Sequence, residues 1–280
     1  MTEPVSFNLV RRRPSPPLDA FVLDICGYRE TSLGLHRQVE TANLVIPLII
    51  SFGTPFRIAL GRRPEAGDRQ PSFTAGLFPG PVHIESDGGA ECLQMDFTPL
   101  GAYRLFGGAV PGLAARMVDI EDVLGHDGRR LRERLGETKS WERRMDLVEK
   151  FVTKRTLHEP SPEIAYAWRE LTRSGGTGRI ACLATEIGWS RKHFARRFTA
   201  EIGLAPKTVA RMIRFHNACR IACNGRTGWA QIAAEAGYAD QAHLVREFGE
   251  LAGEPPAAWA GRVAKLPRDV VARMSYLQDG

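Results

Sequence analysis

The sequence predicts a two-domain α+β protein, with a β-rich barrel and following helices at the N-terminus and an all-α domain at the C-terminus. Three observations support this fold class. The chain has 280 residues, more than a single domain usually holds. Glycine and proline interrupt the apolar stretches between residues 44 and 97. A sequence pattern at 183–198 recurs at 232–248.

Short apolar stretches separated by Gly and Pro dominate residues 44–97. Breakers at this spacing leave room for strands and little room for helices, so we expect an antiparallel sandwich or small barrel. From Pro99 the apolar residues recur with helical spacing, within 100–106 and 119–154. The apolar stretches that we expect to form strands are 44–52, 56–60, 73–78, 82–86 and 92–97.

Proline-rich segments mark the boundaries of the domains. Residues 11–17 combine three arginines with three prolines, which predicts an exposed N-terminal arm without regular structure. Pro160 and Pro162 indicate a linker, with Ser161 placed to cap the next helix. We therefore assign 1–157 to the first domain, 158–162 to the linker, 163–262 to the second domain and 263–280 to a C-terminal tail.

The positive charge of the chain is concentrated in the second domain. The net charge is +6, with 21 basic against 21 acidic residues in 1–160, 14 against 9 in 161–262, and 3 against 2 beyond. A basic module beside a neutral one favours a domain that binds a polyanion. The five cysteines show no CxxC spacing, and we find neither a secretory signal nor an apolar run long enough to span a bilayer. These features predict a cytoplasmic protein without metal, cofactor or membrane partner.

The repeated pattern has the parts of a helix-turn-helix unit. It reads LATEIGWSRKHFARRF at 183–198 and IAAEAGYADQAHLVREF at 232–248. Gly188 and Gly237 suit the left-handed turn that ends a first helix, and Ser190 and Asp240 suit the N-cap of a second one. We expect helix-turn-helix units at about 179–200 and 229–249, joined by a long helix at about 206–223.

The second helix of each unit presents side chains suited to DNA. In the first, Phe194 and Phe198 lie one turn apart and face the core, so Arg191, Lys192 and Arg196 face outward. Cationic side chains attract phosphate, and a guanidinium can pair with the O6 and N7 acceptors of guanine. Single exposed arginines are usually only solvated, but the duplication of the helix favours a DNA interface.

The second domain resembles a known family. Residues 163–260 are similar to the DNA-binding domain of the AraC family. Gly203-Leu204-Ala205-Pro206, then Arg214 and Ala218, match the start of its long central helix, and Gly253-Glu254-Pro255-Pro256 with Trp259 match its closing motif. The sequence departs from the pattern at Arg197, where the family has an apolar residue, and at Ala260, where it has Arg.

The resemblance implies a sequence-specific transcription regulator that acts on promoter DNA, and that contacts RNA polymerase if it activates. Its two recognition helices would read successive segments of the major groove, about 34 Å apart. The base-reading residues implied are Lys192, Ala195, Arg196, Ala242, His243 and Arg246. The residues implied at phosphates or groove edges are Ser190, Arg191, Arg197, Asp240 and Gln241.

The first domain resembles, through fewer residues, the cupin-like sensor domains of such regulators. The resemblance rests on 44–97, Phe97-Thr98-Pro99-Leu100-Gly101 and 119–125. It implies a small-molecule effector, and it makes the helical segment 119–154 the candidate for homodimerisation. Three alternatives stay open: a metal-dependent cupin enzyme, for which His83 and Glu85 supply half a site, a purely structural dimerisation module, and a nonspecific architectural DNA binder. We expect no catalysis, because a His-x-His spacing is missing.

Overall fold

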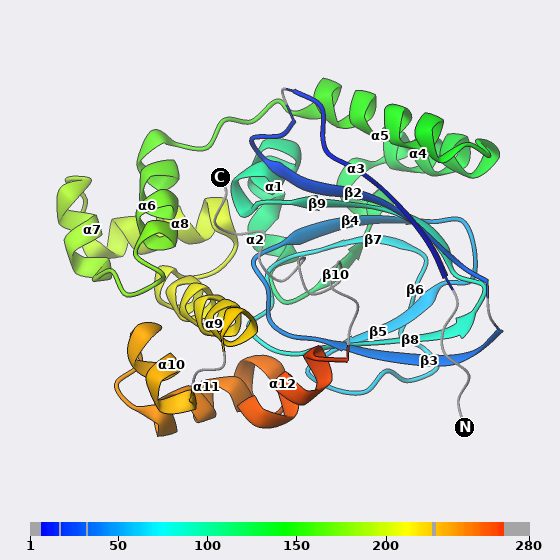
Figure 1. Ribbon diagram of the computed structural model, residues 1–280. Helices are drawn as coiled ribbons and strands as arrows, with labels where there is room; N and C mark the ends of the chain where they lie inside the picture. Colours follow the sequence, from blue (N-terminus) through cyan, green and yellow to red (C-terminus); the bar gives the residue numbers. More distant parts are fainter. Residues whose placement is uncertain (1–6, 17, 32, 226–227, 266–280) are drawn as a thin grey trace.

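The computed structural model describes residues 7–16, 18–31, 33–225 and 228–265. Its N-terminal domain consists of two antiparallel sheets that face each other, with helices over one of them (Figure 1). The six-stranded sheet has the order β1 (Phe7–Arg12), β2 (Val22–Glu30), β9 (Glu91–Phe97), β4 (Ile46–Ser51), β7 (Ser72–Ala75) and β10 (Met117–Asp119). The four-stranded sheet has the order β3 (Leu33–Glu40), β8 (Val82–Gly88), β5 (Phe56–Leu60) and β6 (Arg69–Gln70).

The chain crosses repeatedly from one sheet to the other, and glycines permit the short crossing from β8 to β9. Between β8 and β9, Gly88 and Gly89 have φ values of +92° and +75°. Residues with a side chain rarely adopt this region, so two glycines allow the chain to turn within three residues. The β-rich expectation is confirmed, and the strands form two separate sheets in place of one closed ring.

Strand β4 explains why the sequence shows a continuous apolar run here instead of alternation. Ile46, Leu48 and Ile50 are fully buried against the covering helices. Pro47 and Ile49 point to the opposite side, between the two sheets, and are half-buried. Both faces of this central strand are therefore apolar, as expected for a strand with protein on one side and an apolar interior on the other.

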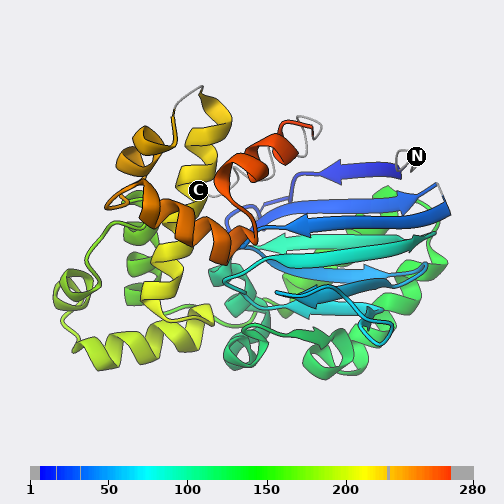
Figure 2. The same ribbon diagram turned by 90° about the horizontal axis from the view of Figure 1, so that it is seen from below.

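Helices cover the outer face of the six-stranded sheet (Figures 1 and 2). Thr98 caps the first of them by accepting a hydrogen bond from the Gly101 amide at 3.0 Å. The Trp141 ring lies directly on Gly27 of β2, where a β-carbon would come within 2.4 Å of the ring. These helices are α1 (Pro99–Phe106), the 3₁₀ turn η1 (Gly107–Ala109), α2 (Val110–Leu113), α3 (Ile120–Leu124), α4 (His126–Glu137) and α5 (Trp141–Arg155).

The described part of the C-terminal domain is helical, and Phe194, Phe198, Phe215, Phe248 and Trp259 fill its core. Phe248 makes edge-to-face contacts with Phe215 and with Trp259, and the ring centroids are 4.9 and 5.6 Å apart, respectively. The helices are α6 (Pro162–Arg173), α7 (Ile180–Glu186), α8 (Arg191–Ile202), α9 (Pro206–Asn224), α10 (Trp229–Glu235), α11 (Gln241–Ala252) and α12 (Pro256–Val263).

The two domains share an extended contact on two sides of the connection at 156–161. On one side, α8 packs against α1 and α2. On the other, the loop between β3 and β4 meets the end of α11, where the Ala42 amide donates to the Leu251 carbonyl at 2.7 Å. Glu201, which is 1% exposed, accepts hydrogen bonds from the Ser161 amide and hydroxyl at 2.8 Å. The apolar core is therefore continuous between the domains.

The structure corrects one expectation about the N-terminus. Residues 11 and 12 were expected in an irregular exposed arm, but they complete β1. Arg12 forms ion pairs with Asp146 and Glu149 of α5, at 2.6 and 2.5 Å. The pairing with β2 and these carboxylates outweigh the disruptive effect of the prolines, which begin only at Pro14. Part of the predicted tail, residues 266–280, lies outside the described residues. Among the helices that the structure describes, none combines the length and apolarity needed to cross a bilayer.

Candidate nucleic-acid interface

The first helix-turn-helix unit consists of α7, a tight turn and α8. Gly188 adopts φ +76°, and the Trp189 amide then donates to the Ala184 carbonyl at 2.9 Å. Ser190 has extended backbone, and its hydroxyl accepts from the His193 amide at 3.2 Å. The left-handed glycine ends α7 and the serine starts α8, as the sequence predicted.

The second unit repeats this geometry with different side chains. Gly237 adopts φ +79°, and the Tyr238 amide donates to the Ala233 carbonyl at 2.8 Å. Asp240 caps α11, because its Oδ1 accepts from the His243 amide at 2.7 Å. The two units that share a sequence pattern therefore also share the same hydrogen bonds at the turn and at the start of the second helix. The long helix α9 joins the two units.

The two recognition helices bury one face and expose the other. Phe194 and Phe198 of α8, and Leu244 and Phe248 of α11, are fully buried. The predicted outward side chains that are exposed are Arg191, Lys192, Arg196, Gln241, Ala242 and Arg246. Ala195, Arg197 and His243 are half-buried. The N-terminal domain packs on the other side of α8 and leaves these outward faces open.

Successive side-chain contacts, from Arg196 to His193 and from His193 to Trp189, orient Arg196. The guanidinium Nη2 lies 3.2 Å from His193 Nδ1, and the His193 ring stands edge-on to Trp189 with centroids 4.6 Å apart. Trp189 itself packs against the core. A long side chain held in this way loses less conformational freedom when it contacts a base, which favours specific readout.

Arg197, which the sequence placed at a phosphate or groove edge, is held on its own helix. Its Nη2 donates to Glu201 Oε1 at 2.8 Å, and the same carboxylate binds Ser161 in the domain connection. The arginine side chain is 43% exposed, so the pair lies at the edge of the interior. Arg197 thus neutralises a buried carboxylate. A phosphate contact by this residue stays a prediction.

A buried carboxylate also fixes the second recognition helix. Glu247 of α11 is 5% exposed and accepts from Arg211 Nε at 2.8 Å and Arg214 Nη2 at 3.1 Å, both on α9. Burial by itself would raise the pKa of Glu247, but hydrogen bonding to Arg211 and the charge of Arg214 outweigh it, and the pKa is lowered. His243 Nε2 lies 3.6 Å from the same carboxylate, and its ring packs edge-on against Tyr238. These ion pairs hold α11 at a fixed position on α9.

Val245 is an exposed residue of the second recognition helix that was not among the predicted base readers. This valine is 40% exposed on the outward side of α11, between the predicted readers Ala242 and Arg246. An exposed β-branched side chain can contact a thymine methyl group. The duplication contained the signal, because Val245 is the counterpart of Ala195, which was singled out in the first unit.

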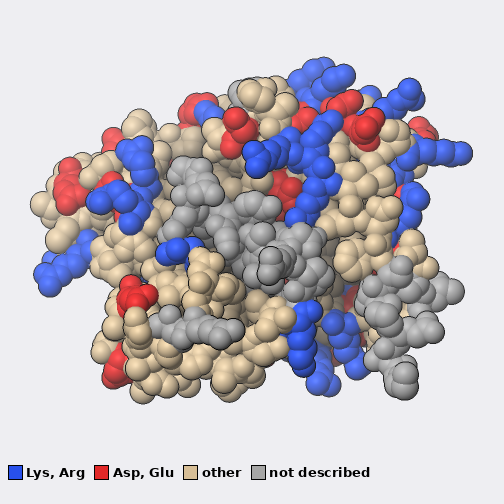
Figure 3. Space-filling model, in the orientation of Figure 1, with Lys and Arg blue, Asp and Glu red and all other residues tan. Residues whose placement is uncertain are grey.

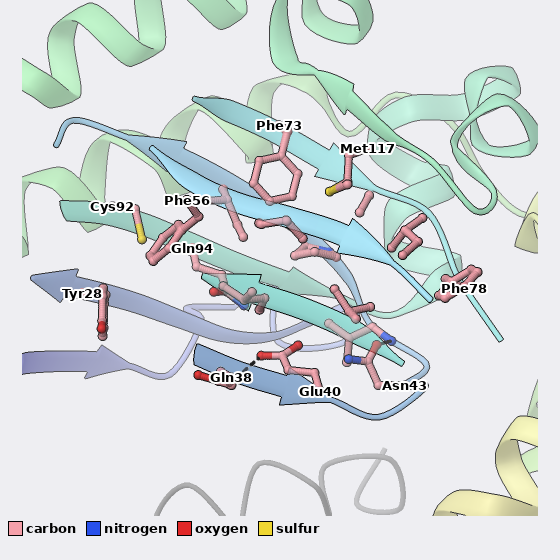
Figure 4. A pocket seen from close by; sticks show the side chains of 18 of the residues that line it. Tyr28, Gln38, Glu40, Asn43, Phe56, Phe73, Phe78, Cys92, Gln94 and Met117 are labelled. Carbon is pink, nitrogen blue, oxygen red and sulfur yellow. Dashed lines mark hydrogen bonds between the residues drawn. The ribbon is translucent and has the colours of Figure 1, made fainter. Parts of the chain in front are cut away.

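A cavity of about 200 Å³ lies between the two sheets of the N-terminal domain (Figure 4). Apolar side chains from both sheets line it, among them Ile49, Phe56, Phe73 and Met117. Thr41 and Asn43 of the β3–β4 loop line the end that faces the C-terminal domain. The cavity has the apolar lining and few polar groups that are typical of small-molecule sites.

The metal-ligand candidates of the sequence do not face this cavity. Val82 and Ile84 of β8 line it, so the alternating residues His83 and Glu85 lie on the outer face of the sheet. Glu85 forms ion pairs there with Arg37 at 2.9 Å and Arg57 at 3.3 Å. Within the described residues, no three His, Cys, Asp or Glu side chains gather as a metal site would require.

The dimerisation candidate, segment 119–154, uses its apolar residues within its own domain. Leu124, Leu131, Leu135, Met145 and Val148 are all buried. Basic and acidic side chains are mixed over the outward face of α4 and α5 (Figure 3). An interface between two copies at these helices would therefore be polar.

The match to a protein family agrees with the helix-turn-helix geometry of the C-terminal domain. Residues 183–262 match a family described as a helix-turn-helix domain. A solved structure of ToxT from Vibrio cholerae O395 is 11% identical, with a TM-score of 0.46, and the match covers 94% of this chain and 99% of that chain. A ToxT structure with bound unsaturated fatty acid is 12% identical, with a TM-score of 0.38, and covers 92% and 95%. The AraC-like transcriptional activator CuxR is 14% identical, with a TM-score of 0.28, and covers 73% and 84%. No curated protein matches the chain.

Proposed function

We propose that this chain is an AraC-type, sequence-specific transcription regulator with two recognition helices, α8 and α11, and the match of residues 183–262 to a helix-turn-helix family supports this. The observation that carries the proposal is the repeated geometry of the two units. In both, a left-handed glycine and a capped helix start leave an outward face exposed, and α9 joins them. The two helices enter successive segments of the major groove on one side of promoter DNA.

The exposed residues of each recognition helix take separate roles at the DNA. Bases are read by Lys192, Ala195 and Arg196 in the first unit, and by Ala242, His243 and Arg246 in the second. To these we add Val245. Phosphates and groove edges are contacted by Ser190, Arg191, Arg197, Asp240 and Gln241. The first unit, with more cationic side chains, supplies more of the phosphate attraction.

The Arg196→Ala variant tests the assignment of the recognition face. A site is first selected from random DNA, and affinity is then measured for single base-pair changes at fixed salt. Loss of a bidentate guanine contact costs about 1 to 3 kcal/mol and relaxes preference at one base pair. Arg173→Ala on α6 is the matched control, since Arg173 is 73% exposed but lies outside both recognition helices. Unchanged site preference in Arg196→Ala contradicts the proposed face.

The same measurement separates regulation from architectural binding. A specific regulator binds its selected site about 10³-fold or more tightly than random DNA at the same salt concentration. Equal affinity for both favours an architectural protein.

Since its target is DNA, we place the protein in the cytoplasm, with RNA polymerase as a partner at promoters that it activates.

We further propose that the cavity of the N-terminal domain holds a small effector, and that the β3–β4 loop transmits its presence. Thr41 and Asn43 line the cavity, while Ala42 between them is buried on the other side. The Ala42 amide donates to Leu251 of α11, and its carbonyl lies 3.2 Å from His216 Nε2 of α9. A ligand that displaces this loop therefore acts directly on the second helix-turn-helix unit.

Hydrogen exchange of the Ala42 amide tests this coupling, because it reports the contact with Leu251. If the contact and DNA binding are linked, selected operator DNA changes the protection of this amide. The Glu30 amide, bonded to the Ala90 carbonyl inside the N-terminal domain at 2.8 Å, is the control and keeps its exchange rate. Equal Ala42 protection with and without DNA contradicts the coupling.

A further inference from the structure

The loop between α6 and α7, residues 174–179, lies directly against the long helix α9. Gly176 is buried and has φ +75°, and a β-carbon there would come within 2.2 Å of the Ala210 carbonyl oxygen and 2.9 Å of the Arg214 amide nitrogen. Glycine permits both the left-handed conformation and this close approach of two backbones. Because α7 begins directly after the loop, the contact fixes the start of the first helix-turn-helix unit on α9.

The same loop also contacts the turn of the second unit. A β-carbon at Gly237, between α10 and α11, would lie 2.3 Å from Thr177 Cγ2 and 3.6 Å from Thr177 Cβ. The threonine side chain is held in place, because its hydroxyl donates to the Ser174 carbonyl at 2.7 Å and a β-branched side chain has few rotamers. The equivalent turn of the first unit differs, since a β-carbon at Gly188 would meet no atom of the described residues within 4 Å.

Arg214 completes these contacts from the side of α9. Its guanidinium carbon lies 4.9 Å from the centroid of the Tyr238 ring, and its Nη2 donates to Glu247 of α11 at 3.1 Å. Tyr238 directly follows Gly237 in the turn and is 5% exposed. The loop before the first unit, the long helix and the second unit therefore meet at one place. Two units joined by a single connection can change their relative orientation, whereas a second contact between them restricts that motion.

We propose that this inter-unit junction, formed by Gly176, Thr177, Arg214, Gly237 and Tyr238, sets the spacing between the two DNA segments that the chain recognises. The proposal rests on the DNA-reading role given above to α8 and α11, and it adds residues that act by positioning these helices. A turn of DNA takes about 10.5 base pairs, so one inserted base pair moves a segment by about 3.4 Å and rotates it by about a tenth of a turn. Recognition helices held at a fixed separation accept one such spacing.

Exchange of one methyl group across the contact between Thr177 and Gly237 tests the proposal. The probes are duplexes that carry the selected site, with the stretch between its two recognised segments lengthened or shortened by one or two base pairs. Wild type should prefer the selected spacing at least about tenfold over spacings changed by one base pair. Gly237→Ala forces a methyl group against Thr177 Cγ2 and displaces the turn before α11, so this preference should fall at least about fivefold.

A second substitution should reverse the effect. Thr177→Ser removes Cγ2 but keeps the hydroxyl that bonds Ser174. In the double variant Thr177→Ser/Gly237→Ala, the new methyl group faces the β-carbon of residue 177 at 3.6 Å, which is an ordinary contact. The spacing preference of the double variant should therefore return to within about twofold of wild type. Thr177→Ser alone leaves the contact without its methyl group, and the preference should fall at least about twofold.

Gly188→Ala is the matched control, because Gly188 has φ +76° where Gly237 has φ +79°, in the equivalent turn. This variant carries the strain of a left-handed alanine without the contact to Thr177, so it should keep the spacing preference of wild type. Circular dichroism checks the fold of each variant. If Gly237→Ala does not fold, Thr177→Ser decides the question, since it introduces no strain.

Four results would each overturn the proposal: equal affinity of wild type for all spacings, an unchanged preference in Gly237→Ala and Thr177→Ser, an equal loss in Gly188→Ala and Gly237→Ala, or a double variant no better than Gly237→Ala. Affinity for random DNA is measured at the same salt concentration. Specific binding of wild type without a spacing preference removes this inference alone. Failure of wild type to bind any site specifically removes the proposed function, and this inference with it.

Discussion

The buried carboxylate under the second recognition helix yields a prediction whose size can be worked out from its contacts. Glu247→Gln removes the charge but preserves the shape of the side chain. The carboxylate is 6% exposed and accepts two charged hydrogen bonds, from Arg211 at 31% exposure and Arg214 at 17%. A charged hydrogen bond contributes about 1.5 to 3 kcal/mol, and the glutamine keeps one neutral acceptor. Allowing for solvent at Arg211, we expect a loss of about 2 to 3 kcal/mol in unfolding free energy.

The effect should depend on pH in a defined direction. The folded-state pKa of Glu247 lies below the unfolded value, so its charge contributes stability above the unfolded pKa of about 4.3. This contribution is lost as pH falls through the folded pKa. The difference between wild type and Glu247→Gln should therefore be full at pH 7 and shrink below about pH 4.

Urea unfolding followed by circular dichroism, at pH 7 and at a series of lower pH values, measures the difference in unfolding free energy between wild type and Glu247→Gln. Glu250→Gln is the matched control, since Glu250 lies on the same helix and pairs with the same Arg211, but is 62% exposed. An exposed pair contributes about 0 to 1 kcal/mol, so the control should lose little. Equal losses in both variants, or a Glu247→Gln effect independent of pH, would refute the reasoning.

Three further predictions concern packing and charge. Gly176→Ala should lower the free energy of unfolding, measured with urea or heat, by more than about 3 kcal/mol. Gly176 has φ +75°, and a β-carbon there would lie 2.2 Å from the Ala210 carbonyl oxygen. Gly188→Ala, at φ +76° with nothing within 4 Å, should cost only about 1 kcal/mol, and equal costs would contradict the steric reading. Phe198→Ala should cost about 3 to 5 kcal/mol, since the ring is fully buried, and a smaller loss in urea unfolding would show that the core relaxes around it. Arg191→Ala should lower the slope of log affinity against log salt by about one across all DNA sequences; a change at one base pair only would make it a base reader.

Much of the second domain could be read from the sequence because its signals are local. The left-handed glycines, the caps Ser190 and Asp240, and the spacing of Phe194 and Phe198 each act within one or two turns of helix. The β-rich class of the first domain was also readable from the spacing of Gly and Pro. Its first strand was not, because Arg12 finds its carboxylates on α5, more than 130 residues away.

Helical periodicity and capping depend on near neighbours, so the duplicated helix-turn-helix units, their turns and caps, and the outward side of each recognition helix follow from the order of the amino acids. Three other features arise only when distant segments pack together. This packing divided the strands into two sheets and so created the cavity. It paired the carboxylates Glu201 and Glu247 with distant parts of the chain, and it placed Ala42 between the cavity and α11. These depend on strand register and on contacts between residues far apart in the chain, which no local pattern encodes.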